Sequence, residues 1–179
     1  ANVEHEHEVI DGLPDMITGL LDSVDIEIIH GRGKFVDAHT IEVDQQRYTA
    51  DKIVIATGLR PHHLDVMGSE LTHDSTDFMN LKQLPENIVI IGAGYIGLEV
   101  VETLRERGLN VRLIHRGNKL MSILDPELSD IIYEEAIKHG VEVLVNEETL
   151  GYEGTESVEA VRTKTGTYET DLVVVATGV

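Results

Sequence analysis

Residues 88–97 read IVIIGAGYIG, four aliphatic residues that run directly into the pattern Gly-x-Gly-x-x-Gly. The aliphatic run predicts a buried strand, and the amphipathic stretch over 95–107 predicts a helix. In such a strand-turn-helix setting, Gly92 makes the tight turn, Gly94 lets a pyrophosphate approach the backbone, and Gly97 lets the helix pack closely on the strand. The stretch therefore predicts a dinucleotide site with the pyrophosphate at the helix N-terminus.

Strand and helix patterns alternate on the C-terminal side of this motif. Aliphatic runs over 111–114, 141–145 and 172–176 predict strands, and an amphipathic stretch over 126–139 predicts a second helix. Residues 149–168 predict a small antiparallel meander. Because alternating strands and helices are typical of a parallel sheet with crossover helices, we predict an α/β fold. The predicted fold is a Rossmann-like NAD(P)-binding domain with a parallel sheet and an antiparallel β-meander.

A repeated phrase relates the two halves of the sequence. Residues 48–58 (YTADKIVIATG) and residues 168–178 (YETDLVVVATG) share Tyr-x-x-Asp, four mostly aliphatic residues and Ala-Thr-Gly. Only the second copy follows a glycine motif, since Gly92 lies 84 positions before Ala176. The same count back from Ala56 falls before Ala1. We therefore expect this sequence to be a piece of a longer protein whose first half is incomplete here.

The residues before the glycine motif predict a second structural part. The patterns there predict a helix over 11–23, a strand over 26–29, a meander over 34–43 and a buried strand over 53–56. Residues 60–86 are polar and contain Pro61 and Pro85, which is typical of a connection between domains. With the boundary near Gln83, we predict two domains, residues 1–83 and residues 84–179.

Composition excludes several classes of function. Lys and Arg number 14 against 33 Asp and Glu, and the net charge of -19 repels polyanions, so we predict no nucleic-acid partner. No apolar run approaches the roughly 20 residues that span a bilayer, so we predict no membrane segment and a cytoplasmic protein. The sequence has no cysteine and therefore no thiolate or disulfide of its own. His5 and His7 occupy alternate positions, which on a strand would place both side chains on one face as a possible metal-binding pair. We favour a frayed acidic terminus instead and predict no metal site.

The end of the second predicted strand bears on the choice between NAD and NADP. An NAD site has an acidic residue roughly 20 positions after the glycine motif, where it binds the ribose 2′-hydroxyl. Here the strand over 111–114 ends in His115 and Arg116, and Lys119 is near enough in sequence to help bind a phosphate. Arg116 can pair with a 2′-phosphate through its fork of donors, and His115 can add a contact. We therefore favour NADP(H) over NAD(H).

These residues resemble the pyridine nucleotide-disulfide oxidoreductases, a flavoprotein family that includes glutathione reductase and coenzyme A disulfide reductase. The resemblance rests on the paired Ala-Thr-Gly strands, on the motif from Gly92 that continues as Tyr95-Ile96-x-x-Glu99, and on the lead-in from Asp74 to Pro85. It implies that residues 1–83 are the C-terminal part of an FAD-binding domain. It also implies a homodimer for the intact protein.

The resemblance also implies site residues. Thr57 and Gly58 would contact FAD, Tyr95 would cover the nicotinamide subsite, and the Glu99 carboxylate would lie beside the nicotinamide ring, so Tyr95 and Glu99 are the candidate catalytic residues. The candidate residues for binding cofactor are Gly92, Ala93, Gly94, Tyr95, Ile96, Gly97, Glu99, His115, Arg116, Thr57, Gly58, Thr177 and Gly178.

The implied activity belongs to the intact protein. Hydride would pass from NADPH through FAD to a cysteine disulfide and then to a small-molecule disulfide substrate, while this sequence alone would bind nucleotide without turnover. Two alternatives stay open: an NADH oxidase-type flavoprotein without the disulfide relay, and a non-catalytic nucleotide-binding module. A Cys-x-x-x-x-Cys pair in the upstream sequence would support the relay, and a single cysteine there would support the oxidase.

Overall fold

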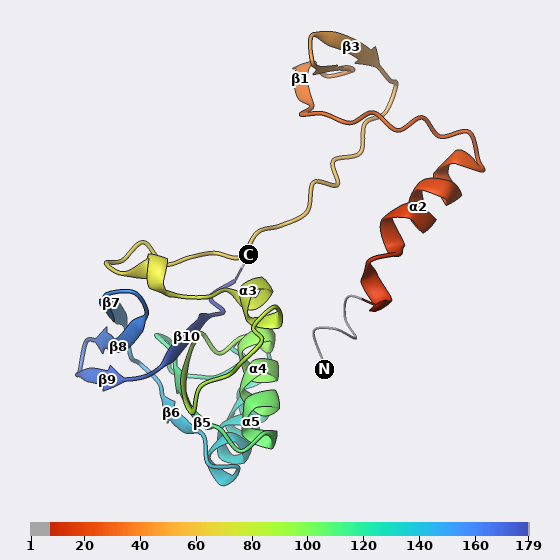
Figure 1. Ribbon diagram of the computed structural model, residues 1–179. Coiled ribbons are helices and arrows are strands. Elements are labelled where there is room, and N and C mark those ends of the chain that lie inside the picture. The colour runs from red at the N-terminus through yellow and green to blue at the C-terminus, as the bar shows by residue number, and fades with distance from the viewer. Residues whose placement is uncertain (1–7, 179) are drawn as a thin grey trace. The chain divides into compact units, whose positions relative to one another are not determined.

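The computed structural model describes residues 8–178, and the chain forms two compact units, Ala1–Gly58 and Leu59–Val179 (Figure 1). The second unit begins before the predicted boundary at Gln83, because the connecting residues pack on it. His73 forms a bridge with Val174, and Phe78 belongs to the core of this unit. Whether residues 1–83 belong functionally to an FAD-binding domain stays a prediction.

A parallel sheet of four strands forms the centre of the second unit. Its strands are β4 (Asn87–Ile91), β5 (Asn110–Ile114), β6 (Glu142–Leu144) and β10 (Leu172–Val175), in the order β10-β4-β5-β6. Helix α4 (Tyr95–Glu106) connects β4 to β5, and helix α5 (Pro126–Lys138) connects β5 to β6. The predicted alternation of strands and helices is therefore confirmed.

The sheet is buried on both faces, which explains its unbroken aliphatic runs. Ile88 and Ile90 of β4 pack in a core with Leu104 of α4, whereas Val89 and Ile91 face a second core. That second core includes residues of an antiparallel meander, which consists of β7 (Thr149–Gly154), β8 (Val158–Thr163) and β9 (Thr167–Glu169). Figure 1 shows the helices and the meander on opposite faces of the sheet. The helices and the meander thus enclose β4 and β10, which lie in the middle of three layers.

Local signals set the ends of these elements. Gly108 follows α4 and Gly140 follows α5, both at φ 79°, a left-handed conformation in which glycine has no Cβ penalty. Pro126 occupies the first turn of α5, but the Asp125 side chain forms no capping hydrogen bond. Asp74 does cap the short helix α3 (Ser75–Met79), with its carboxylate accepting from two backbone N–H groups. A one-turn 3-10 helix, Ser69–Leu71, precedes α3.

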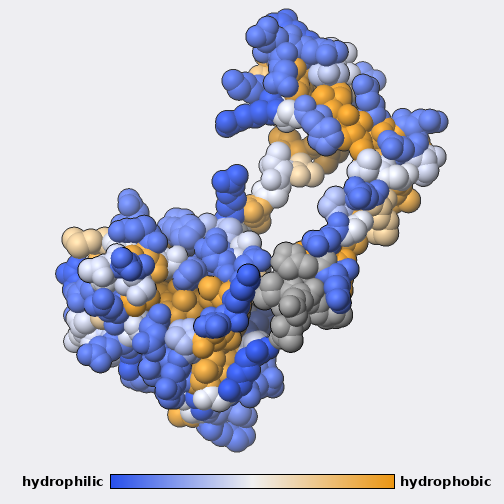
Figure 2. All heavy atoms as spheres, viewed as in Figure 1, coloured by the Kyte–Doolittle hydropathy of each residue, from blue (hydrophilic) through white to orange (hydrophobic). Residues whose placement is uncertain are grey.

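The first unit contains one helix and one small sheet. Helix α2 (Leu13–Asp22) matches the predicted helix, and strands β1 (Lys34–Asp37) and β2 (Thr40–Val43) match the runs predicted over 34–43. The third strand of this antiparallel sheet, β3 (Gln46–Thr49), was not predicted. Apolar side chains of this unit remain at its surface, as Figure 2 shows in orange, and Leu20 of α2 is 67% exposed.

Two strands predicted in the first unit are absent from it. Residues 26–29 and 53–56 lie in no strand, and Val54 and Ile55 are 87% and 69% exposed. A strand needs a neighbour for its N–H and C=O groups, and neither segment has one among the described residues. By contrast β10, the equivalent segment of the second copy, pairs with β4 along its whole length and is buried.

Candidate functional site

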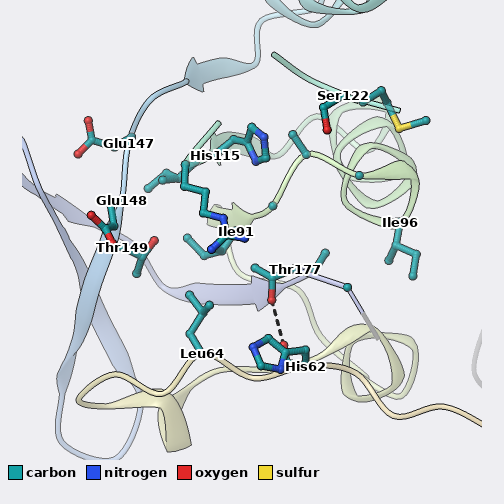
Figure 3. A pocket seen from close by; sticks show the side chains of 18 of the residues that line it. His62, Leu64, Ile91, Ile96, His115, Ser122, Glu147, Glu148, Thr149 and Thr177 are labelled. Carbon is teal, nitrogen blue, oxygen red and sulfur yellow. Dashed lines mark hydrogen bonds between the residues drawn. The ribbon is translucent and has the colours of Figure 1, made fainter. Parts of the chain in front are cut away.

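A pocket of about 510 Å3 lies at the carboxyl ends of the parallel strands in the second unit (Figure 3). Four of its walls are the loops that follow β4, β5, β6 and β10, and further walls come from His62, from residues 64–66 and from residues 121–123. Ligands of open α/β sheets bind in this crevice, outside the carboxyl ends of the strands. Predicted site residues from three separate loops meet there: Gly92, Ala93, Gly94, Tyr95, Ile96, His115, Arg116, Thr177 and Gly178.

The three glycines of the motif have different surroundings, as the sequence predicts. Gly92 has a φ of 107°, and a Cβ there would collide with the carbonyl oxygen of Ala176. A Cβ at Gly97 would collide with the carbonyl oxygen of Gly92, so this glycine lets α4 pack on the loop. A Cβ at Gly94 would meet nothing within 4 Å. The space over Gly94 is therefore open, as the approach of a phosphate requires.

The start of α4 supplies hydrogen-bond donors to this space. The first hydrogen bond of the helix runs from the Leu98 N–H to the Gly94 carbonyl, at 3.1 Å. The N–H groups of Tyr95, Ile96 and Gly97 consequently have no partner within the helix. Together with the positive end of the helix dipole, they favour an anion over Gly94.

His115 lies at the end of β5, where hydrogen bonds fix its backbone. Its N–H donates to the Leu144 carbonyl at 2.8 Å, and its carbonyl accepts from the Glu147 N–H at 3.0 Å. Burial lowers the pKa of His115 below 6.5, the Arg116 charge lowers it further, and a backbone contact with Lys119 acts in the opposite direction. Without a bound nucleotide, the imidazole is therefore mostly uncharged at neutral pH.

Arg116 is the cation that remains available on this side of the pocket. It is exposed and forms no hydrogen bond or ion pair with the residues over 8–178. Lys119, by contrast, pairs with Asp130 at 2.7 Å and does not line the pocket. The help that the sequence suggests from Lys119 is therefore not available in this structure, and Arg116 carries the positive charge alone.

Sequence reasoning missed the acidic wall of the pocket. Glu147 and Glu148 follow β6 and lie near Thr149 in Figure 3. The carboxylate of Glu147 is buried and accepts from the N–H of Thr165 at 2.9 Å and from its hydroxyl at 2.7 Å. Burial acts to raise the pKa of Glu147, but hydrogen bonds from Thr163 and Thr165 outweigh it and leave the pKa lowered. No sequence motif marks these residues. They could have been assigned to the pocket only from the pairing of β6 with β5, which brings the loop after β6 to the same edge of the sheet.

The two candidate catalytic residues lie one turn apart on α4. Tyr95 is 61% exposed and lines the pocket beside the glycine loop. Glu99 is exposed but does not line the pocket, so its place beside a nicotinamide ring stays a prediction. Residues at i and i+4 share one face of a helix, which places both side chains on the same side of α4.

The Ala-Thr-Gly ends of the two copies differ. Thr177 and Gly178 follow β10 and line the pocket, and the Ala176 N–H donates to the Ile91 carbonyl at 2.7 Å. Thr57 and Gly58 belong to the first unit and do not line it. Their predicted contact with FAD stays a prediction.

The sequence model of the pyridine nucleotide-disulphide oxidoreductase family matches residues 1–179. This chain belongs to that family. Among members of the family, a glutathione reductase from Nostoc sp. is 37% identical over 132 residues, which cover 74% of this chain and 29% of that protein. A soluble pyridine nucleotide transhydrogenase from Vibrio vulnificus is 39% identical over 170 residues, which cover 90% of this chain and 36% of that protein.

Two solved structures agree with the fold. The HOCl-induced flavoprotein disulfide reductase RclA from Escherichia coli superposes with a TM-score of 0.85 at 25% identity, over 98% of this chain and 42% of that chain. A ferredoxin reductase from Rhodopseudomonas palustris superposes with a TM-score of 0.78 at 25% identity, over 89% of this chain and 43% of that one. The chain thus spans less than half the length of each of these proteins.

Among residues 8–178, no helix is both long and apolar enough to cross a bilayer. The same residues contain no group of three or more His, Cys, Asp or Glu side chains arranged to hold a metal ion. His5 and His7 lie outside the described residues.

Proposed function

We propose that the second unit is the NADP(H)-binding part of an FAD-dependent oxidoreductase that reduces a small-molecule disulfide. Membership of the family supports a flavoprotein that uses pyridine nucleotides. The observation that carries the nucleotide site is the open space over Gly94, where helix N–H donors and the positive end of α4 converge. We further propose that residues 1–83 complete an FAD-binding domain, and that the intact protein is a homodimer.

The residues of this chain would bind and orient the nucleotide. NADPH supplies a hydride and FAD receives it for transfer to the disulfide. The glycine loop would hold the pyrophosphate, and Tyr95 would form an aromatic lid over the nicotinamide subsite. The Glu99 carboxylate, on the same face of α4, would lie beside the nicotinamide ring and help to orient it.

Arg116 would decide the preference for NADP(H). Its guanidinium is exposed, unpaired within residues 8–178, and placed at the end of β5, where the adenosine ribose lies in sites of this kind. A 2′-phosphate gives it a charge-assisted hydrogen bond that a 2′-hydroxyl does not. Because His115 is neutral at pH 7, most of the preference depends on Arg116.

Calorimetric titration of the chain with NADPH and with NADH tests this assignment. Arg116→Glu should weaken NADPH binding by about 1.5–3 kcal/mol, the value of a hydrogen bond to a charged group, and should change NADH binding less. Arg107→Glu is a matched control, because Arg107 is exposed, lies outside the pocket and gives the same change in net charge. Equal affinity of the unaltered chain for both nucleotides, or an unchanged NADPH affinity in Arg116→Glu, would contradict the proposal.

A second candidate function is hydride exchange between two pyridine nucleotides. It is favoured by the similarity to the Vibrio vulnificus transhydrogenase, which extends over 90% of this chain. The two candidates differ in the final acceptor of electrons. An intact protein that reduces a nicotinamide analogue with NADPH, but reduces no disulfide, would support exchange; NADPH-dependent reduction of glutathione disulfide would support the reductase.

A further inference from the structure

His62 is held at the rim of the pocket by its backbone alone. Its N–H donates to the Gly178 carbonyl at 2.8 Å, and its carbonyl accepts from the Thr177 hydroxyl at 3.0 Å, the dashed line in Figure 3. These two bonds tie the connecting segment to the loop that ends β10. Because neither bond uses the imidazole, the position of the backbone does not depend on the side chain.

The imidazole of His62 has no partner in the described part of the chain. It lines the pocket and is exposed, and no hydrogen bond or ion pair joins it to residues 8–178. The adjacent His63 differs, because its ring lies 3.6 Å from the Asp74 carboxylate and does not line the pocket. The chain therefore fixes one histidine beside the cavity with its donor and acceptor groups unused.

The order of the strands places His62 relative to a bound dinucleotide. Strand β4, with the glycine loop, lies between β5 and β10. A pyrophosphate over Gly94 with its adenosine half toward His115 and Arg116 must extend its other half toward the end of β10. In Figure 3, His62 and His115 lie on opposite sides of the strand end that carries Thr177. His62 is thus on the side that receives the nicotinamide half.

We propose that His62 binds the nicotinamide mononucleotide half of NADP(H), through a hydrogen bond from its imidazole to the phosphate or ribose of that half. The inference rests on the proposed function, because it needs a nucleotide bound at the glycine loop. It adds a binding residue that lies outside the glycine motif, on the segment that connects the two Ala-Thr-Gly copies. His62 would then select for the complete dinucleotide over its adenosine half.

Two ligands separate the halves of the site: NADPH, and 2′,5′-ADP, which keeps the adenosine and the 2′-phosphate but has no nicotinamide. Calorimetry on the full chain compares His62→Ala with the control His63→Ala. We expect His62→Ala to weaken NADPH binding about threefold to tenfold, the loss of one hydrogen bond, and to leave 2′,5′-ADP binding unchanged. His63→Ala should leave both affinities unchanged.

Three results would overturn the inference. An unchanged NADPH affinity in His62→Ala would show that the imidazole makes no contact. An equal loss for NADPH and 2′,5′-ADP would show a general disturbance of the pocket. An unaltered chain that binds neither ligand would reject the proposed function itself, and this result differs from the other two because it appears before any substitution.

Discussion

Substitution of Gly94 by alanine separates nucleotide binding from folding. Gly94 has φ -79° and ψ -178°, an extended conformation open to any residue, and a Cβ there has open space on all sides. Alanine lowers the entropy of the unfolded chain, which stabilises by about 0.4–1 kcal/mol, and as an N-cap it is worse than glycine by a similar amount. We therefore expect the free energy of unfolding to change by less than about 0.5 kcal/mol.

The same methyl group would occupy the space that a pyrophosphate needs. Loss of one hydrogen bond to the charged phosphate costs about 1.5–3 kcal/mol, or roughly a 10- to 100-fold rise in the Kd for NADPH. Calorimetry measures the Kd, and thermal unfolding measures stability. Gly97→Ala is the contrasting variant, because its Cβ collides with the Gly92 carbonyl and should lower stability as well. Wild-type affinity in a folded Gly94→Ala would refute the phosphate cradle.

Two further substitutions probe the interior of the second unit. The pKa of His115 is below 6.5 in the folded state, so the unfolded state binds more protons and stability falls as the pH drops through 6.5. His115→Asn should therefore lose less stability than the unaltered chain between pH 7.5 and pH 5.5 in thermal unfolding, and parallel curves would contradict this. Tyr152 is buried, and its hydroxyl has no hydrogen-bond partner among residues 8–178. Tyr152→Phe should leave the free energy of unfolding unchanged or raise it by up to about 1 kcal/mol in denaturant titrations; a clear loss would indicate a partner for the hydroxyl.

The sequence was sufficient where a local pattern carries its own physical cause. The aliphatic run before Gly92 and the three glycine positions predicted the strand, the turn and the start of α4, because each glycine answers a steric requirement. Gly108 and Gly140 likewise marked the ends of the helices. The second meander, and the first two strands of the meander in the first unit, followed from short strands separated by turns.

The walls of the pocket could not be predicted in the same way. Glu148 and His62 have no motif, and they reach the pocket because β6 pairs with β5 and because a connecting segment is tied to Gly178. Lys119 lies close to Arg116 in sequence, but the turn between β5 and α5 directs it to Asp130 instead. Side-chain partners of this kind depend on the tertiary arrangement, which sequence spacing does not specify.

The two copies of the Ala-Thr-Gly phrase show how strand pairing creates the site. At the end of the second copy, the Ala176 N–H donates to the Ile91 carbonyl of β4. The loop after β4 is tied to β5 in the same way, because the Gly92 N–H donates to the Ile114 carbonyl. These bonds hold the loops after three strands at one edge of the sheet, where the pocket forms. Residues 53–56 have the same apolar pattern but no neighbouring strand among the described residues, and Val54 and Ile55 are exposed. The phrase alone therefore does not create a strand or a site; both require a paired neighbour that brings further loops to the same edge.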